Sequence, residues 1–225
     1  MNEYVPGQHS DRLPETFSLL SQAPDAIVQD TCDEAGIWMR QLLGRPVEGH
    51  ECQVTLLALR LALEAGEVRT TQGIRQVIWA GMLHDIGKSA IDPRIINKPG
   101  GLTDQEQEIM RHHPSLGRRL ASMAPGVDAE ILTAINHHHE RWDGQGYPAG
   151  LIGESIPMLA RILKVADVYD ALVTDRPYRP AWSTEEAVTY LMNHAGTDFD
   201  PRLVRVFVHQ VLCTHGSQDS QFPEF

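Results

Sequence analysis

Residues 74–88 read IRQVIWAGMLHDIGK, an apolar run that ends in His84-Asp85-Ile86-Gly87-Lys88. The apolar side chains cover most sides of a helix expected at 72–84, as in a helix that is buried in a core. An unpaired carboxylate at the end of such a helix is costly, and a metal ion bound to Asp85 removes that cost. The alternative is an ordinary helix end, with Gly87 as its cap and Asp85 in a salt bridge. We favour the metal, because Lys88 is close enough to Asp85 to face a phosphate resting on it.

The composition narrows the class of protein. The chain has 225 residues, 42% of them hydrophobic, and a formal net charge of −11. This charge argues against binding to a polynucleotide, although metals and local cations leave room for a small anionic ligand in one cleft. The three cysteines Cys32, Cys52 and Cys213 lack the spacing of a zinc knuckle and fit a reducing cytosol. No apolar run or leader pattern indicates a membrane span or secretion, so we expect a cytoplasmic protein.

Helix signals follow one another along the chain, and no strand pair with a hairpin turn is indicated. Capping boxes at Thr103/Glu106 and Ser183/Glu186 open two helices. Asp128 and Asp200 are expected to cap two more. The remaining helices are expected at 33–43, 47–65, 72–84 and 158–173, with a further helical piece from Pro114 to about Met123. The sequence therefore predicts an all-α, single-domain helical bundle.

The domain boundaries follow from the same pattern. Residues 1–45 are expected to form an N-terminal lead with short helices, in which residues 1 to about 30 are either irregular or a short docking helix. Residues 46–213 form the main domain, and 214–225 form a polar tail that frays. Residues 89–101 are expected to form a loop. Residues 140–157 read ERWDGQGYPAGLIGESIP, which predicts a long ordered loop anchored by Trp142, Tyr147, Leu151 and Ile152.

Side chains that can bind a metal recur at helix ends and inside one apolar helix. Imidazole and carboxylate without thiolate suit iron or manganese better than structural zinc. The set is too large for one ion, so we expect two divalent metal ions bridged by Asp85, with open positions for water. Asp170 shares a helix face with one of these ligands and is expected to orient a histidine. The expected ligands are His50, His84, Asp85, His113, His138, His139 and Asp167.

The other histidines are interpreted as surface or capping residues. Consecutive residues of a helix point about 100° apart, so His137, His138 and His139 cannot all face one small cluster. Trp142 and Asp143 are interpreted as structural supports of the long loop. The histidines placed outside the cluster are His9, His112, His137, His194, His209 and His215.

Four stretches together resemble one family. HDIGK, the downstream HHE-RWDGQGYP, the helix KVADVYDAL and the loop DRPYR are similar to the HD-GYP family, bacterial phosphodiesterases within the HD metal-dependent hydrolase superfamily. The similarity extends from about His50 to Val208. It implies an HD-type helical bundle with an ordered GYP loop, and metal-hydroxide hydrolysis of cyclic di-GMP to pGpG, GMP or both.

The resemblance also implies roles for single residues. His50, His84, Asp85 and Asp167 correspond to the metal ligands shared by HD proteins, and His113, His138 and His139 to ligands added in the HD-GYP branch. Lys88 corresponds to the lysine on the scissile phosphate, so Asp85 and Lys88 are the expected catalytic pair. Arg176 and Arg179 correspond to basic residues that hold the nucleotide. Tyr147 of Gly146-Tyr147-Pro148 is open between loop packing and contact with a ligand or partner, such as a diguanylate cyclase domain.

One position departs from the family. Members with three metals carry a glutamate four residues before the first histidine, where this chain has Pro46. Glu48 lies two residues away and points elsewhere on a helix, so we predict two metals. Two alternatives to a cyclic di-GMP phosphodiesterase remain. One is hydrolysis of another cyclic dinucleotide such as cyclic GMP-AMP, and the other is a weakly active binding module that signals through partner contacts.

Overall fold

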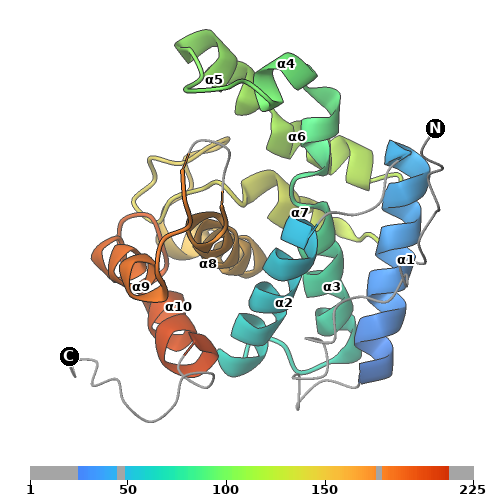
Figure 1. The fold of residues 1–225 in the computed structure, drawn as a ribbon. Helices are drawn as coiled ribbons and strands as arrows, with labels where there is room; N and C mark the ends of the chain where they lie inside the picture. The colour runs from blue at the N-terminus through green and yellow to red at the C-terminus, as the bar shows by residue number, and fades with distance from the viewer. Residues whose placement is uncertain (1–24, 45–48, 176–178, 213–225) are drawn as a thin grey trace, which may run out of the picture.

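The computed structural model describes residues 25–44, 49–175 and 179–212 (Figure 1). This part of the chain is helical, and apart from two isolated bridges it holds no strand, which confirms the all-α class. The helices are α1 (Asp25–Leu43), α2 (Gly49–Glu64), α3 (Thr71–Leu83), η2 (Ile86–Ala90), α4 (Pro93–Ile96), α5 (Asp104–Met110), α6 (His113–Ala121), α7 (Ala129–His137), η3 (Gly153–Ser155), α8 (Met158–Val173), α9 (Thr184–Asn193), α10 (Pro201–Val206) and η4 (Phe207–Leu212).

The core forms where α2 and α3 pack against each other, with α1 against α3 and α8 against α2 (Figure 1). A short connection joins α2 to α3, so the two helices run in opposite directions. The start of α2 therefore lies beside the end of α3. This arrangement places His50, in the first turn of α2, next to His84, the C-cap of α3.

Helix α1 begins at Asp25, eight residues before the predicted start, so the alternative of an irregular segment up to residue 30 is wrong at its end. Val28, Cys32, Ala35 and Met39 are each at most 2% exposed and face the core. Their spacing of three and four residues defines one apolar helix face. Part of the predicted lead thus packs into the main core.

The predicted loop 89–101 is also partly helical. Helix η2 runs through Ala90, and the four-residue helix α4 follows it. The Asp92 side chain accepts a hydrogen bond from the backbone N–H of Arg94, and Pro93 occupies the first helical turn. Proline is favoured there because its missing N–H would have no helical partner. An Asp-Pro pair thus begins a helix where the prolines had suggested a loop.

The capping predictions are confirmed. Thr103 with Glu106, and Ser183 with Glu186, form complete capping boxes. The Asp128 side chain accepts from the backbone of Glu130 and Ile131 at the start of α7. Asp200 caps α10 in the same way.

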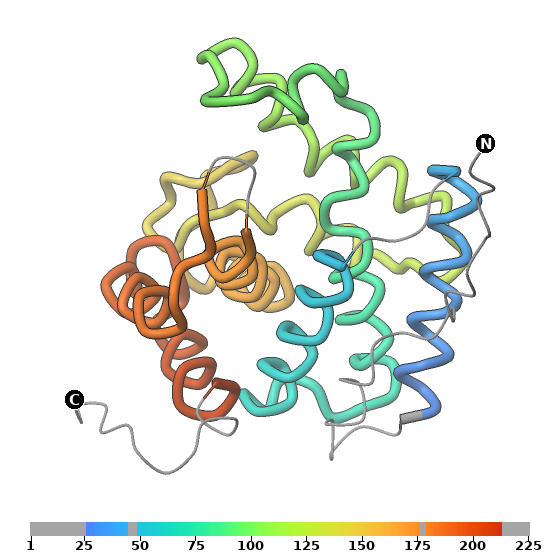
Figure 2. Tube along the Cα trace, viewed as in Figure 1, coloured from blue at the N-terminus to red at the C-terminus, as the bar shows by residue number. Residues whose placement is uncertain are grey.

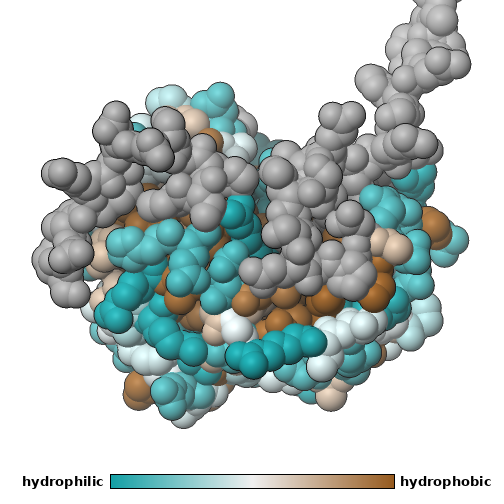
Figure 3. Space-filling model, turned by 90° about the horizontal axis from the view of Figure 1, so that it is seen from below, coloured by the Kyte–Doolittle hydropathy of each residue, from teal (hydrophilic) through white to brown (hydrophobic). Residues whose placement is uncertain are grey.

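The short helices α4 and α5 form a lobe at one end of the molecule (Figure 1). The trace in Figure 2 rises from α3 through η2 to this lobe and returns through α6 and α7. Five of the expected ligands belong to this path: His84 and Asp85 follow α3, His113 begins α6, and His138 and His139 follow α7. The face seen in Figure 3 shows hydrophilic side chains interleaved with apolar patches, some bordering the segments drawn in grey. Among the described helices, none is both long enough and apolar enough to cross a membrane.

Candidate metal centre

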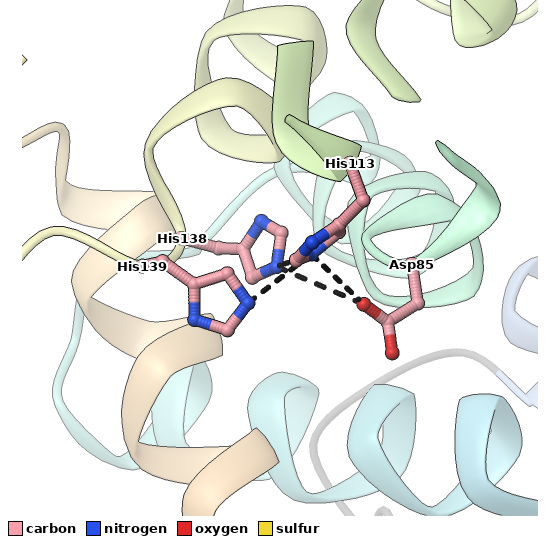
Figure 4. A group of neighbouring side chains, drawn as sticks. All are labelled: Asp85, His113, His138 and His139. Atoms are coloured by element: carbon pink, nitrogen blue, oxygen red, sulfur yellow. Dashed lines mark hydrogen bonds and ion pairs between the residues drawn. The ribbon is translucent and has the colours of Figure 1, made fainter. Parts of the chain in front are cut away.

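Side chains from three parts of the fold converge beneath the α4–α5 lobe to form a first group. Figure 4 shows Asp85, from the end of α3, facing His113 at the start of α6 and the pair that follows α7. The Nε2 atoms of His113 and His138 are 3.3 Å apart, and those of His113 and His139 are 3.1 Å apart. Asp85 Oδ1 lies 3.2 Å from His113 Nε2 and 3.9 Å from His138 Nε2. These four residues form the first ligand group.

A second ligand group meets the other oxygen of the same carboxylate. Asp85 Oδ2 lies 3.5 Å from His84 Nε2 and 3.8 Å from His50 Nε2. Asp167 of α8 closes the group, with Oδ1 3.4 Å from His50 Nε2 and 3.8 Å from His84 Nε2. One carboxylate oxygen of Asp85 thus faces each group, the arrangement of a bridging ligand.

The backbone fixes the tautomer of three of the histidines. The Nδ1–H groups of His84, His113 and His138 donate to the carbonyls three residues earlier, those of Gly81, Met110 and Ile135, at 2.7–2.8 Å. Each Nε2 is left with a lone pair that points into the cluster. This is how metal-binding histidines are oriented, and all three residues stand at helix ends, where such carbonyls need donors.

His50 is oriented by a carboxylate. Its Nδ1 lies 2.6 Å from Asp170 Oδ2, which leaves Nε2 toward Asp85 and Asp167. Burial disfavours the imidazolium, but hydrogen bonds to Asp167 and Asp170 outweigh it and raise the pKa of His50 to about 10. The predicted orienting role of Asp170 agrees with this geometry.

Electrostatics hold Asp85 ionised and keep the imidazoles of His138 and His139 neutral. Burial favours protonated Asp85, yet His84 and Lys88 keep its pKa well below the ordinary value. Burial, with the nearby His84 and His113, lowers the pKa of His138 to about 3. Burial, His138 and the ammonium of Lys164 lower the pKa of His139. Anionic carboxylate and neutral imidazole are the protonation states that bind metal, so an ion at His50 would displace the proton that Asp167 and Asp170 favour there.

The residues present fit a pair of divalent ions. His84 Nε2 is buried and makes no hydrogen bond, although such atoms are normally paired. Three further Nε2 atoms face one another without a donor assigned between them. A cation supplies the missing partner for each lone pair. Nitrogen and carboxylate donors without sulfur suit iron, manganese or a similar metal.

Two of the three cationic side chains predicted to bind substrate, Lys88 and Arg179, lie within the described residues. Lys88 Nζ is in close contact with Asp85 Oδ2, at the side of the bridging carboxylate. Arg179 donates through Nη2 to the carbonyls of Ala171 and Leu172 at the end of α8, and its Nη1 is buried without a hydrogen bond. Arg176 lies outside the described residues, as does Pro46, on which the prediction of two metals depends.

The loop 140–157 is ordered around a residue that sequence reasoning missed. Glu140 is 2% exposed, and its carboxylate accepts hydrogen bonds from the backbone N–H groups of Ala149 and Leu151. His137 Nδ1 lies 3.2 Å from the same carboxylate, so His137 supports the loop rather than the cluster. The sequence offered one signal for this role, a glutamate directly after three histidines. If such a glutamate is buried, its carboxylate needs partners.

The aromatic residues of this loop differ in role. The Tyr147 ring stacks on the His139 ring, with centroids 5.0 Å apart, so Tyr147 covers a ligand of the first group. Trp142 lies under the guanidinium of Arg161, and Asp143 binds Arg141, both structural contacts as predicted. The predicted anchor Ile152 is 64% exposed and does not anchor the loop.

Gly146 explains the first letter of the GYP motif. A Cβ at this position would lie 2.2 Å from the backbone nitrogen of Arg141 and 2.5 Å from the Cα of Glu140. Real side chains do not make such contacts, so only glycine lets the loop return against its own start. The return places Tyr147 over His139.

The remaining histidines lie outside the ligand groups. His112 is exposed, and His194 stacks on Tyr190 with its Nδ1–H donating to the Tyr190 carbonyl. His209 lies in η4. His9 and His215 are outside the described residues.

Comparison with known proteins matches most of the helical bundle to one protein family. Residues 40–203 match the HD domain family. A cyclic di-GMP phosphodiesterase of Pseudomonas aeruginosa is 44% identical over 158 residues, 70% of this chain and 38% of that protein. The 3'3'-cGAMP-specific phosphodiesterase 2 of Vibrio cholerae is 41% identical over 172 residues, 73% of this chain and 31% of that protein. The chain thus spans less than half the length of these relatives.

A solved structure agrees with the fold. Bd1817, an HDG"Y"P protein from Bdellovibrio bacteriovorus, superposes with a TM-score of 0.60 at 19% sequence identity. The alignment covers 81% of this chain and 69% of that one. The helical bundle is therefore shared, and at this identity the agreement concerns the fold alone.

Proposed function

The chain belongs to the HD domain family and to its HD-GYP branch, and from this premise we propose that it is a metal-dependent phosphodiesterase that hydrolyses cyclic di-GMP to pGpG, GMP or both. The observation that carries the proposal is the position of Asp85. Its two oxygens face two ligand groups, and Lys88 lies beside it. A pure binding module needs no such arrangement.

The chain's own residues would divide the work as follows. His50, His84 and Asp167 would hold one ion, and His113, His138 and His139 the other, with Asp85 shared. Two bound divalent ions, iron or manganese by donor chemistry, activate water and neutralise charge on the reacting phosphate. Lys88, which in the structure contacts Asp85 Oδ2, would move onto a phosphate oxygen and stabilise the charge that develops there.

Two features would keep the site in its working state. The carbonyls and Asp170 that bind the Nδ1 atoms hold four rings in place, which lowers the cost of assembling the site on metal binding. Tyr147 covers His139 and limits the access of solvent to that ligand.

We propose that the exposed Ile152 of the same loop contributes to a surface for a protein partner.

The test is anaerobic purification, followed by metal counting and product chromatography on one sample. We expect about two ions of iron or manganese per chain and release of pGpG or GMP from cyclic di-GMP. His84→Ala should lower both metal content and turnover, whereas Arg119→Gln on the exposed side of α6 should change neither. A wild-type protein that carries both ions and releases no product would refute the proposal.

The identity with a cGAMP-specific phosphodiesterase supports a second substrate of the same class. Competition between cyclic di-GMP and 3'3'-cGAMP for one metal-loaded sample would rank the two. If unlabelled cGAMP suppresses hydrolysis of labelled cyclic di-GMP only at a large excess, cyclic di-GMP is the preferred substrate. If unlabelled cGAMP suppresses the hydrolysis without a large excess, cyclic GMP-AMP is the preferred substrate.

A further inference from the structure

A stack of three side chains rises from the first ligand group toward the α4–α5 lobe. His139 is its base, and the Tyr147 ring covers it at 5.0 Å with an interplanar angle of 21°. The guanidinium carbon of Arg111 lies over the Tyr147 ring, 5.5 Å from its centroid. The Tyr147 ring thus contacts both His139 and the guanidinium of Arg111. Arg111 is thereby held above the metal centre.

The charge of Arg111 is not neutralised by an acid in the described residues. Arg75, Arg94 and Arg161 each meet a carboxylate within 2.7 Å, and Arg141 and Arg202 are also paired with acids. Arg111 is exposed, and among the described residues its guanidinium contacts the Tyr147 ring and no carboxylate. A contact with a ring face satisfies none of the N–H groups of a guanidinium, so those of the exposed Arg111 are available for an anion.

Arg111 is also close in sequence to a residue of the metal centre. It is the C-cap of α5, two residues before the ligand His113, so the lobe and the metal centre are joined directly at this point. The guanidinium contacts the Tyr147 ring, which in turn contacts the ring of His139, one of the nitrogen donors. A phosphate in contact with the metals and Lys88 would thus lie away from Arg111. A second anionic group on the same ligand could reach it.

We propose that Arg111 binds the second phosphate of a cyclic dinucleotide, the phosphodiester that is not being cleaved, while the first lies at Asp85 and Lys88. The inference rests on the proposed function and adds a basis for selectivity. A cyclic dinucleotide carries two phosphates on one small ring, whereas a simple phosphodiester carries one. Arg111 therefore favours the cyclic dinucleotide over diesters with a single phosphate.

The test compares substrates with two phosphates and with one. Arg111→Gln, Arg111→Lys and the control Arg119→Gln are assayed with cyclic di-GMP and with bis(4-nitrophenyl) phosphate, after thermal unfolding has shown that each is folded. Loss of a charge-assisted contact should raise KM for cyclic di-GMP about 10- to 100-fold in Arg111→Gln. Its kcat, and its rate on bis(4-nitrophenyl) phosphate, should stay near wild type. The KM of Arg111→Lys for cyclic di-GMP should lie between those of wild type and Arg111→Gln, and it should rise with salt concentration.

Other results would overturn the inference. Equal losses on both substrates would show that Arg111 only positions Tyr147 and His139, and unchanged kinetics on both would show no contact. Inhibition of bis(4-nitrophenyl) phosphate hydrolysis by cyclic di-GMP gives its affinity without turnover. If cyclic di-GMP inhibits but is not hydrolysed, the proposed function fails while the Arg111 contact is still measured. If it neither inhibits nor reacts, both proposals fail.

Discussion

The hydrogen bond between Asp170 and His50 decides which imidazole nitrogen faces the cluster. Asp170 is 5% exposed and sits one turn after Asp167 on α8, so one helix supplies both a ligand and the group that orients its neighbour. In metalloproteins such supporting carboxylates raise the basicity of the ring and fix its direction. The residue deserves a direct test because it would not touch the metal.

We predict that Asp170→Asn lowers metal affinity or turnover about 10- to 100-fold, because the amide supports the His50 tautomer less well than a carboxylate does. Metal content after dialysis against a graded chelator series gives the affinity. Asp104→Asn, an exposed carboxylate in the first turn of α5, is the matched control. Full metal retention in Asp170→Asn would contradict the orienting role.

Gly87 sets how closely η2 approaches α6. A Cβ there would lie 2.0 Å from the carbonyl oxygen of His113 and 2.5 Å from the nitrogen of Gly117. We predict that Gly87→Ala destabilises the protein by about 1–3 kcal/mol, as overpacking does. It should also displace His113 and reduce bound metal.

Urea unfolding and metal analysis of the same sample would check this prediction. Gly101→Ala is the control, because nothing lies within 4 Å of a Cβ at that position. If the Gly87 and Gly101 variants behave alike, the close contact does not position His113.

At the scale of elements, Asp128 connects two ligand-bearing helices. It caps α7, which leads to His138, and accepts hydrogen bonds from Gln72 and Gln76 of α3, which leads to His84. Partial burial raises its pKa, but the backbone N–H groups and the two amides outweigh this, so the net shift is downward. A carboxyl with a lowered folded pKa stabilises the protein above its unfolded pKa, and the stabilisation disappears as the pH falls through the folded value.

We therefore predict that Asp128→Ala costs about 0.5–2 kcal/mol at neutral pH. The difference from wild type should shrink below about pH 4, near the unfolded pKa of aspartate. Urea unfolding of chelator-treated protein at several pH values measures it without metal release. Asp128→Asn keeps an oxygen acceptor, so its cost at neutral pH should be smaller than that of Asp128→Ala, and it should shrink over the same pH range because both variants lack the titrating carboxyl. A constant Asp128→Ala difference down to strongly acidic pH would argue against a charged cap.

At the scale of the whole molecule, the site connects several helices. The proposed ligands come from α2, α6 and α8 and from the ends of α3 and α7, which are packed in one core. Ions bound among them stabilise the folded state and have no comparable site in the unfolded chain.

We predict that saturating Mn²⁺ raises the melting temperature of chelator-treated protein. One site filled at about 100 times its Kd contributes about 2.7 kcal/mol, or about 5–10 °C for a chain of this size. His84→Ala should lose most of the shift. An equal rise in that variant would place the stabilising metal elsewhere.

The sequence by itself determined the helical class and the capped helix starts, and it predicted which histidines and aspartates would lie together. Helix periodicity and caps depend on residues a few positions apart, and a histidine or aspartate at a helix end shows its chemistry in the chain. The HD and GYP stretches carried the family in the same way, because their functional residues stand close together in sequence.

Only the tertiary structure decided how these residues are grouped. That each oxygen of Asp85 faces a different ligand group, that Glu140 holds the loop, and that Arg111 stacks on Tyr147 all depend on segments far apart in the chain. The same holds for α1, whose first turns follow a polar stretch but pack on α3. Such contacts arise from the packing of whole helices, whose relative positions no local pattern specifies.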